Sequence, residues 1–244
     1  MLPSTPAEPN PFRFFRPRRP DRPFIVAQLG QSLDGRIATV TGDSKYIGSR
    51  PSLAHLHAIR AHVDAVVVGI GTVLADDPRL NVRHCPGPNP ARVVIDAKGR
   101  LPAAAQCLDG SDGARRVVLR GASMPAGHFP EGVEQHGLPV NAAGRFDLVE
   151  LARALRRLGF ERVLLEGGAA IISQAIDAGI VDRLHLMVSP VLIGSGQPGL
   201  ELAPIQRLAE ARRPQVEVIM LGAGEVLFDC DLVSDQRGDH GNGA

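Results

Sequence analysis

The order of apolar runs in this 244-residue sequence predicts an α/β fold with a largely parallel sheet. Short, continuously apolar runs alternate with stretches of helical periodicity, which is the pattern of strands buried on both faces. The last two apolar runs are instead separated by Gly222-Ala-Gly224, a sequence that favours a hairpin. We therefore expect a mixed sheet whose C-terminal edge is antiparallel.

Each element follows from its own local pattern. The first helix has Leu53, Leu56 and Ile59 on one face, and Pro51 suits its start. In the second helix, Gly159 is a good stop after an amphipathic stripe of leucines. Strands are expected at residues 24–29, 64–70, 92–96, 115–120, 163–166, 183–194, 216–221 and 225–232, and helices at 52–60, 146–158 and 169–178.

The two ends of the sequence differ from its middle. Residues 1–22 are rich in proline and arginine and are expected to form a disordered arm, and the polar residues 234–244 a disordered tail. Residues 23–233 show neither an internal repeat nor a shift in composition, so we predict one domain there.

Composition excludes several classes of function. The net charge of +1 gives no general attraction to nucleic acid or membranes, and no apolar run approaches the ~20 residues of a membrane helix. Three separated cysteines without a Cys-x-x-Cys pair indicate reduced thiols in the cytoplasm and argue against a structural zinc. We expect no bound metal and a small-molecule ligand.

The bend after residues 64–70 starts like a dinucleotide-binding turn, with Gly69-x-Gly71. A Rossmann turn also needs a third glycine and a long helix. Leu74 occupies the third glycine position, and Pro78 leaves room for about one helical turn. The pattern therefore argues against a Rossmann fold, although Asp96 ends a strand near where a ribose-binding acid would lie.

A second bend, Glu166-Gly167-Gly168, leads directly into a helix. Glycines allow a ligand to approach the backbone, and the first N–H groups of a helix attract anions. This arrangement suits a pyrophosphate. A tight structural turn explains the same residues equally well, so the bend alone leaves both interpretations open.

Six stretches occur in an order that carries a resemblance: LGQSLDGRIA, TGDSKYIGS, VVVGIGTVLADDPRLNVR, RVVIDAKGRL, VLLEGGAAI and VSPVLIGSG. Together they resemble the reductase domain of the bacterial riboflavin-biosynthesis deaminase/reductase, over nearly all of the chain from Pro23 to about Leu232. The resemblance implies a dihydrofolate-reductase-like three-layer α/β/α fold and a cytoplasmic homodimer, with Gly222–Gly224 as a candidate contact. It also implies NADPH-dependent reduction of 5-amino-6-(5-phosphoribosylamino)uracil, or its diamino-pyrimidinone analogue, to the ribitylamino compound.

Members of this family are commonly fused behind a zinc deaminase, whose H-x-E and P-C-x-x-C signature is absent here. The chain therefore resembles a free-standing reductase. We expect His55, His57 and His62 at the surface of a helix or the edge of the core, and not at a metal.

The resemblance also implies site residues. Glu166 is expected to be catalytic, contacting pyrimidine N–H groups or assisting proton transfer, and arginine suits the substrate phosphate because its planar fork binds oxygens in pairs. Leu80 is expected to pack on the sugar or base. Substrate-binding residues are then Ser44, Arg60, Leu80, Arg83 and Glu166, and cofactor-binding residues are Gln31, Tyr46, Gly69, Thr72, Asp76, Ala97, Gly168, Ala169, Ala170, Ile171, Ile172 and Ser173.

Two features leave alternatives open. Lys98 or Arg100 could meet the 2′-phosphate of NADPH, whereas Asp96 at the strand end would favour a plain ribose. Gln28 stands where the family often has a lysine, so the substrate could be another heterocycle, such as dihydrofolate. A nucleotide-binding protein without turnover is a further alternative, which the set Arg60, Arg83 and Glu166 disfavours. Asp34 precedes a glycine in a turn signal and is expected to be structural.

Overall fold

The computed structural model describes residues 12–13, 15–16, 19–44 and 47–233. Within these residues the helices are α1 (Arg50–His62), α2 (Ile70–Asp76), α3 (Leu148–Arg157) and α4 (Ala169–Asp177). The strands are β1 (Phe24–Ser32), β2 (Arg36–Ala38), β3 (Ala65–Gly69), β4 (Ala91–Asp96), β5 (Arg116–Gly121), β6 (Val133–Leu138), β7 (Arg162–Glu166), β8 (Arg183–Ser189), β9 (Gln197–Pro198), β10 (Gln215–Gly222) and β11 (Glu225–Asp231).

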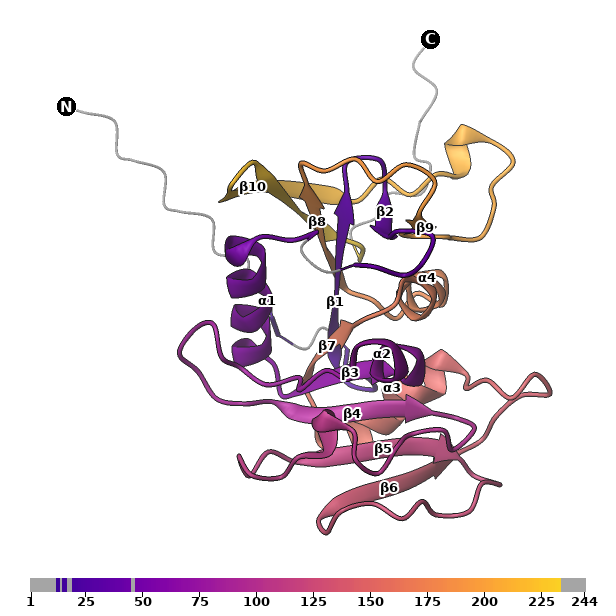
Figure 1. Cartoon of the computed structure of the whole chain (residues 1–244). Coiled ribbons are helices and arrows are strands. Elements are labelled where there is room, and N and C mark those ends of the chain that lie inside the picture. Colours follow the sequence, from indigo (N-terminus) through magenta and orange to yellow (C-terminus); the bar gives the residue numbers. More distant parts are fainter. Residues whose placement is uncertain (1–11, 14, 17–18, 45–46, 234–244) are drawn as a thin grey trace.

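Nine strands form the main sheet in the order β10-β11-β8-β1-β7-β3-β4-β5-β6 (Figure 1), and β2 and β9 form a second, two-stranded sheet. From β8 to β6 in this order, neighbouring strands pair in parallel. Strand β11 pairs antiparallel with both β8 and β10. The predicted mixed, mostly parallel sheet with a C-terminal antiparallel hairpin is therefore confirmed. At the hairpin, Gly222, Ala223 and Gly224 all have positive φ, which glycine adopts readily.

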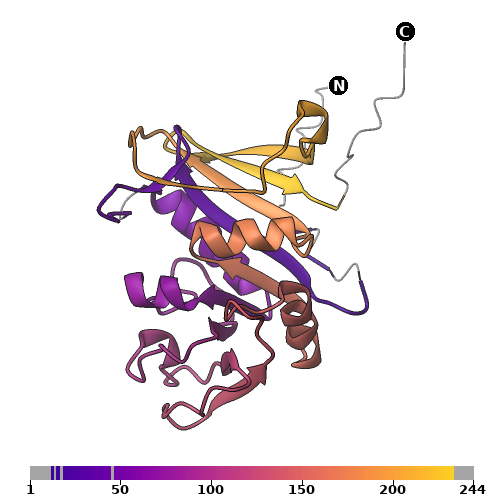
Figure 2. The same ribbon diagram turned by 90° about the vertical axis from the view of Figure 1, so that its right-hand side faces the viewer.

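Helices cover both faces of the sheet, so the fold has three layers (Figure 2). Successive residues of a buried strand point to opposite faces. Val26 packs in one cluster with Ile59 of α1 and Val73 of α2, and Ile25 packs in the other with residues of α3 and α4. This burial on both sides explains why the strands are continuously apolar. None of the described helices is long and apolar enough to cross a membrane.

Helix α1 differs from its predicted packing. Ile59 is buried as expected, but Leu53 is 39% exposed, and His55 and His57 are buried. His55 Nε2 lies 3.1 Å from Nδ1 of His185 on β8. The prediction of surface or core-edge histidines is therefore wrong for two of the three, because polar partners on other elements allow α1 to bury polar side chains. His62 is exposed, with Nδ1 against the carbonyl of Ala58.

Part of the predicted arm packs on the domain. Phe15 is buried against Phe24, and the guanidinium of Arg22 forms a buried pair with both carboxylate oxygens of Asp182. Phe15 and Arg22 therefore pack as part of the domain, although they precede its predicted start at residue 23. Residues 1–11 and the predicted tail 234–244 lie outside the described part of the chain.

The sequence patterns also miss three strands, β2, β6 and β9. The sequence of strand β6, VEQHGL, shows too little alternation of apolar and polar residues to predict a strand, and most of its residues are only half buried. It pairs with β5 from Val133 to Leu138, so its neighbour rather than its own apolar content determines its conformation.

Candidate active site

A cavity of about 550 Å³ opens at the carboxyl ends of β1 and β7. Its walls also include α2, the first turns of α1, the segment before α1 and the turn between β7 and α4. Parallel strands bring their carboxyl ends to one edge of a sheet, which is where α/β proteins bind ligands.

The two glycine-containing bends lie side by side in this cavity. The hydroxyl oxygen of Thr72, on α2, accepts a hydrogen bond from the backbone N–H of Gly168 at 3.1 Å. Gly167 has a φ of 113°, and a Cβ there would lie 2.4 Å from the Thr72 oxygen. Only glycine fits that position. Gly71, by contrast, lines the cavity and has open space where a Cβ would be.

The first bend is not a Rossmann turn. Helix α2 has seven residues, starting two residues earlier than the predicted turn from Thr72, and it ends at Asp77 with φ 40°. Leu74, at the third glycine position, is half exposed. Thr72 and Asp76 of α2 both line the cavity, as the cofactor predictions require.

The second bend has the backbone geometry of an anion site. Gly168 is the N-cap of α4, and no side chain caps the first N–H groups of the helix. Ala170 is exposed beside it. Ile172 and Ser173 are buried, and the Ser173 hydroxyl accepts a hydrogen bond from the N–H of Glu201 at 2.9 Å. Their side chains thus pack into the protein, so a cofactor contact at these two residues would be made by the backbone, as expected for a pyrophosphate on the first turn of α4.

Glu166 lines the cavity at the end of β7 and is held by Arg60 of α1. Arg60 Nε donates to Oε2 at 3.0 Å, Nη2 donates to Oε1, and Nη1 donates to the carbonyl of Asn81 at 2.9 Å. Arg60 is only 4% exposed. Two of its N–H donors are therefore used in orienting Glu166 and a third on the Asn81 carbonyl.

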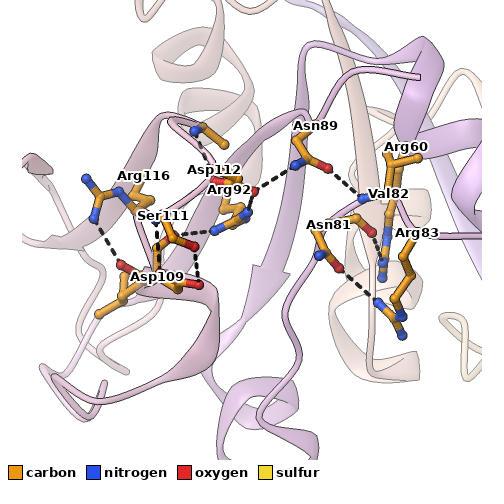
Figure 3. Close-up of polar contacts among 12 residues, drawn as sticks. Arg60, Asn81, Val82, Arg83, Asn89, Arg92, Asp109, Ser111, Asp112 and Arg116 are labelled. Atoms are coloured by element: carbon orange, nitrogen blue, oxygen red, sulfur yellow. Dashed lines mark hydrogen bonds and ion pairs between the residues drawn. The ribbon is translucent and has the colours of Figure 1, made fainter. Parts of the chain in front are cut away.

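Arg83 lies beside this pair. Its Nη1 donates to the side-chain oxygen of Asn81 at 3.0 Å, so Asn81 holds both arginines (Figure 3). Burial lowers the pKa of Arg83, and the nearby Arg60 and Arg79 lower it further, while Glu166 raises it. Burial lowers the pKa of His57, and the positive charges of Arg60 and Arg83 lower it further, to about 3. Nδ1 of the neutral His57 ring accepts a hydrogen bond from the backbone N–H of Arg83 at 3.0 Å. This cationic cluster suits an anion.

Other predicted residues lie in different places. Ser44 lines the cavity, whereas Gln31, Gly69 and Ala97 are not among its lining residues. Leu80 is 1% exposed in the hydrophobic core and is not among the residues that line the cavity. Tyr46 lies outside the described residues.

The two aspartates that follow strands are structural. Asp96 is buried and accepts the N–H of Leu101 at 2.7 Å, a bond that holds the turn after β4. Asp34 accepts hydrogen bonds from the Ser32 hydroxyl and from the N–H groups of Ile193 and Gly194. Those bonds lower the pKa of Asp34 to about 2. The structural interpretation of Asp34 is confirmed.

Several cavity residues were not predicted as such from the sequence. Leu53 and Leu56 of α1 and Met187 of β8 form an apolar wall. Their sequence pattern resembles that of core residues, and no local signal separates the two cases. Gln28 also lines the cavity, opposite Glu166 in the β1–β7 register. Among the described residues, no group of His, Cys, Asp and Glu side chains is arranged to hold a metal ion.

The profile of the RibD C-terminal domain matches residues 23–217 of this chain. The chain belongs to this family. It is 37% identical over 176 residues to the 2,5-diamino-6-ribosylamino-4(3H)-pyrimidinone 5′-phosphate reductase of Methanothermobacter thermautotrophicus, covering 71% of this chain and 80% of that protein. It is 30% identical over 218 residues to the riboflavin biosynthesis protein RibD of Aquifex aeolicus, covering 88% of this chain and 60% of that protein.

Solved structures agree with this assignment. RibD of Acinetobacter baumannii superposes with a TM-score of 0.73 at 28% identity, covering 87% of this chain and 58% of that one. The chain thus spans less than two thirds of the RibD proteins but most of the archaeal reductase. The predicted family and its dihydrofolate-reductase-like fold are confirmed.

Proposed function

We propose that this chain is an NADPH-dependent reductase of 5-amino-6-(5-phosphoribosylamino)uracil or its 2,5-diamino-pyrimidinone analogue. The observation that carries the proposal is the meeting of the Thr72 and Gly168 bends in a cavity that also contains Glu166. The archaeal relative is named as a reductase of the diamino compound, which supports this substrate class and a place in riboflavin biosynthesis.

The residues of the two bends fit a dinucleotide. The uncapped first turn of α4 offers N–H groups to a pyrophosphate, and Gly71 leaves space for close approach on the opposite side. Because the Thr72 oxygen accepts the Gly168 N–H, its own hydrogen is available to donate to a phosphate oxygen. When bound, the reduced nicotinamide supplies a hydride.

Glu166 suits the pyrimidine end of the substrate. An ionised carboxylate only accepts hydrogen bonds, and each of its oxygens can accept more than one. Arg60 therefore fixes the direction of Glu166 and leaves lone pairs for pyrimidine N–H groups. Arg83 and the nearby Arg79 supply positive charge for the 5′-phosphate.

The chemistry requires alignment more than nucleophilic activation. The hydride adds at C1′ of the ribosyl group, the C1′–O4′ bond breaks, and O4′ takes up a proton to become a hydroxyl. We assign Glu166, which lines the cavity, to hold the incoming proton between solvent and substrate. The apolar wall of Leu53, Leu56 and Met187 excludes water around the reacting carbon.

Charged residues at the end of β4 bear on the proposed coenzyme preference. Asp96 accepts the N–H of Leu101, and the cations Lys98 and Arg120 line the same hollow as Asp96 at the end of β4. Lys98 and Arg100 follow directly in the sequence. We therefore propose NADPH over NADH, with Lys98→Ala narrowing the difference in dissociation constant between the two coenzymes while leaving NADH affinity unchanged.

The test has two steps. In thermal shift, NADPH at about 100 times its dissociation constant should stabilise the protein by about 2.7 kcal/mol, and NADH by less. Turnover is then followed as loss of reduced-nicotinamide absorbance with each ribosylamino-pyrimidine phosphate and, separately, dihydrofolate. Oxidation with dihydrofolate alone would contradict the substrate proposal, and absence of a shift with either coenzyme would contradict the reductase.

We also propose a homodimer in a reducing cytoplasm. Edge strand β10 exposes Val216, Val218 and Met220 on one face, to 44%, 59% and 66%, and such a stripe is typical of an association surface. All three cysteines are free, which supports a reducing compartment. Sedimentation of the wild type and Val218→Lys should give a dimer and a monomer, respectively.

A further inference from the structure

Glu225, the first residue of β11, is a buried carboxylate far in sequence from the residues that bind it. It is 1% exposed. Its oxygens accept hydrogen bonds from the N–H and the hydroxyl of Ser49 at 2.7 and 2.5 Å, from the hydroxyl of Ser52, and from the hydroxyl of Ser189 at 2.8 Å. One side chain thereby joins the hairpin, the start of α1 and the end of β8.

This carboxylate is stabilised by neutral donors. The nearby cations Arg183 and His185 pair with Asp229 and Asp231, and within the described residues no salt bridge involves Glu225. Burial raises the pKa of Glu225, but the bonds from Ser49, Ser52 and Ser189 outweigh it, and the net pKa is lowered. The group is therefore ionised at neutral pH. Since an unpaired buried charge is costly, the four donors must stay in place for the native arrangement to persist.

The donors on α1 lie at one wall of the active-site cavity. Ser49 is the N-cap of α1, and Gly48, Ser52, Leu53 and Leu56 line the cavity around it. The fit is close, because a Cβ on Gly48 would lie 3.3 Å from the Ser52 Cβ and 3.9 Å from a Glu225 oxygen. The two glycine-containing bends follow the parallel strands β3 and β7, and none of these hydrogen bonds of Glu225 reaches them.

No side chain caps the start of α1 in the usual way, since Ser49 makes no cap bond to its own helix. The Ser49 hydroxyl is used on Glu225 instead. Further along the same helix, Arg60 orients Glu166. A rotation of α1 at its start would therefore move both the apolar wall and the guanidinium that fixes the predicted catalytic acid.

We propose that Glu225 is a positioning residue for the reductase, which fastens the first turn of α1 to the β8–β11 edge and so sets the width of the substrate side of the cavity. The kinetic test of this proposal rests on the proposed function, whereas its test by amide hydrogen exchange does not. Glu225 acts through α1 and touches neither substrate nor cofactor.

The test compares Glu225→Gln with Glu217→Gln. Glu217 lies on the neighbouring strand β10 in a partly exposed pair with Arg13, away from the cavity, and serves as the matched control. At a temperature where both are fully folded, Glu225→Gln should raise the KM for the pyrimidine about tenfold and change kcat by less than about threefold. Glu217→Gln should leave both constants at the wild-type values.

A second readout needs no substrate. Amide hydrogen exchange at residues 47–56 should speed up in Glu225→Gln, while exchange in α4 stays unchanged. If Glu225→Gln folds poorly, Ser189→Ala removes a single donor outside the cavity and should shift KM and exchange in the same direction by a smaller factor.

The outcomes separate the two proposals. A lower melting temperature with an unchanged KM and unchanged exchange at residues 47–56 would mean that Glu225 is only structural, which overturns the inference. If the wild type reduces neither pyrimidine, the proposed function fails, and the exchange experiment still decides whether Glu225 fastens α1.

Discussion

At the bend between β7 and α4, Gly167 has positive φ and no room for a side chain, whereas at the bend between β3 and α2, Gly71 faces open space. The two bends follow neighbouring parallel strands and meet through the Thr72–Gly168 hydrogen bond. They therefore look alike in the sequence but are constrained differently in the structure.

The difference separates two reasons for having glycine. At residue 167 the protein itself excludes a side chain, so the glycine is needed for folding whether or not a ligand binds. At residue 71 the protein has room for a Cβ, so a side chain there would compete only with a ligand bound in the cavity. Four substitutions test this contrast.

The largest effect is expected for Gly167→Ala. An L side chain at this φ costs about 1–3 kcal/mol, and the contact with the Thr72 oxygen adds to that. We expect the melting temperature to fall by about 4–8 °C and cofactor binding to be lost, measured by calorimetric and fluorescence titrations. A Gly167→Ala protein with wild-type stability would show that the bend is looser than the structure indicates.

Next in size is Glu166→Gln, which leaves the buried Arg60 without a countercharge. The amide keeps the shape of the side chain but reverses part of its hydrogen-bonding pattern. The value of kcat/KM for the pyrimidine should fall about 100-fold, with cofactor affinity changed little. Equal losses for both ligands would place Glu166 at the cofactor and not at the substrate.

Thr72→Val tests the bond that joins the two bends. Losing the hydroxyl removes the acceptor for the Gly168 N–H and the donor to a phosphate oxygen, so the dissociation constant for NADPH should rise about tenfold. Thr72→Ser keeps the hydroxyl and is the matched control. Similar weakening in both variants would point to the methyl group and not to the hydrogen bond.

The smallest effect is expected for Gly71→Ala, and its two parts have opposite signs. Alanine inside α2 should stabilise the protein by about 0.5–1 kcal/mol, while its methyl group occupies cavity space and weakens NADPH binding. Urea unfolding and a binding titration on the same samples measure both. A loss of stability would remove the proposed contrast between the bends.

Much of the fold follows from the sequence because its cause is local. Continuous apolar strands, the Gly159 helix stop with its φ of 91° and the glycine hairpin all depend on a few neighbouring residues. Strand β6 was missed because its conformation comes from pairing with β5, a tertiary effect that outweighs its weak pattern.

The site was less accessible to sequence reasoning. Ser44, Thr72, Asp76, Glu166 and Gly168 do line the cavity. The core position of Leu80 and the buried face of α1 were not predicted, since an apolar residue beside a ligand and one in the core have the same sequence pattern. Likewise, the pairing of His55 with His185, and of Ser49 with Glu225, joins residues whose proximity only the folded chain reveals.

The central position of β1 has a consequence for biosynthesis. This strand is translated before the other described strands of the sheet, yet Phe24 pairs with Arg162 and Val26 with Arg183. The middle of the sheet must therefore wait for partners translated much later, and such nonlocal pairing slows folding. Truncated nascent chains that stop before β7 should expose an unpaired apolar strand and depend on chaperones until the remaining sequence emerges.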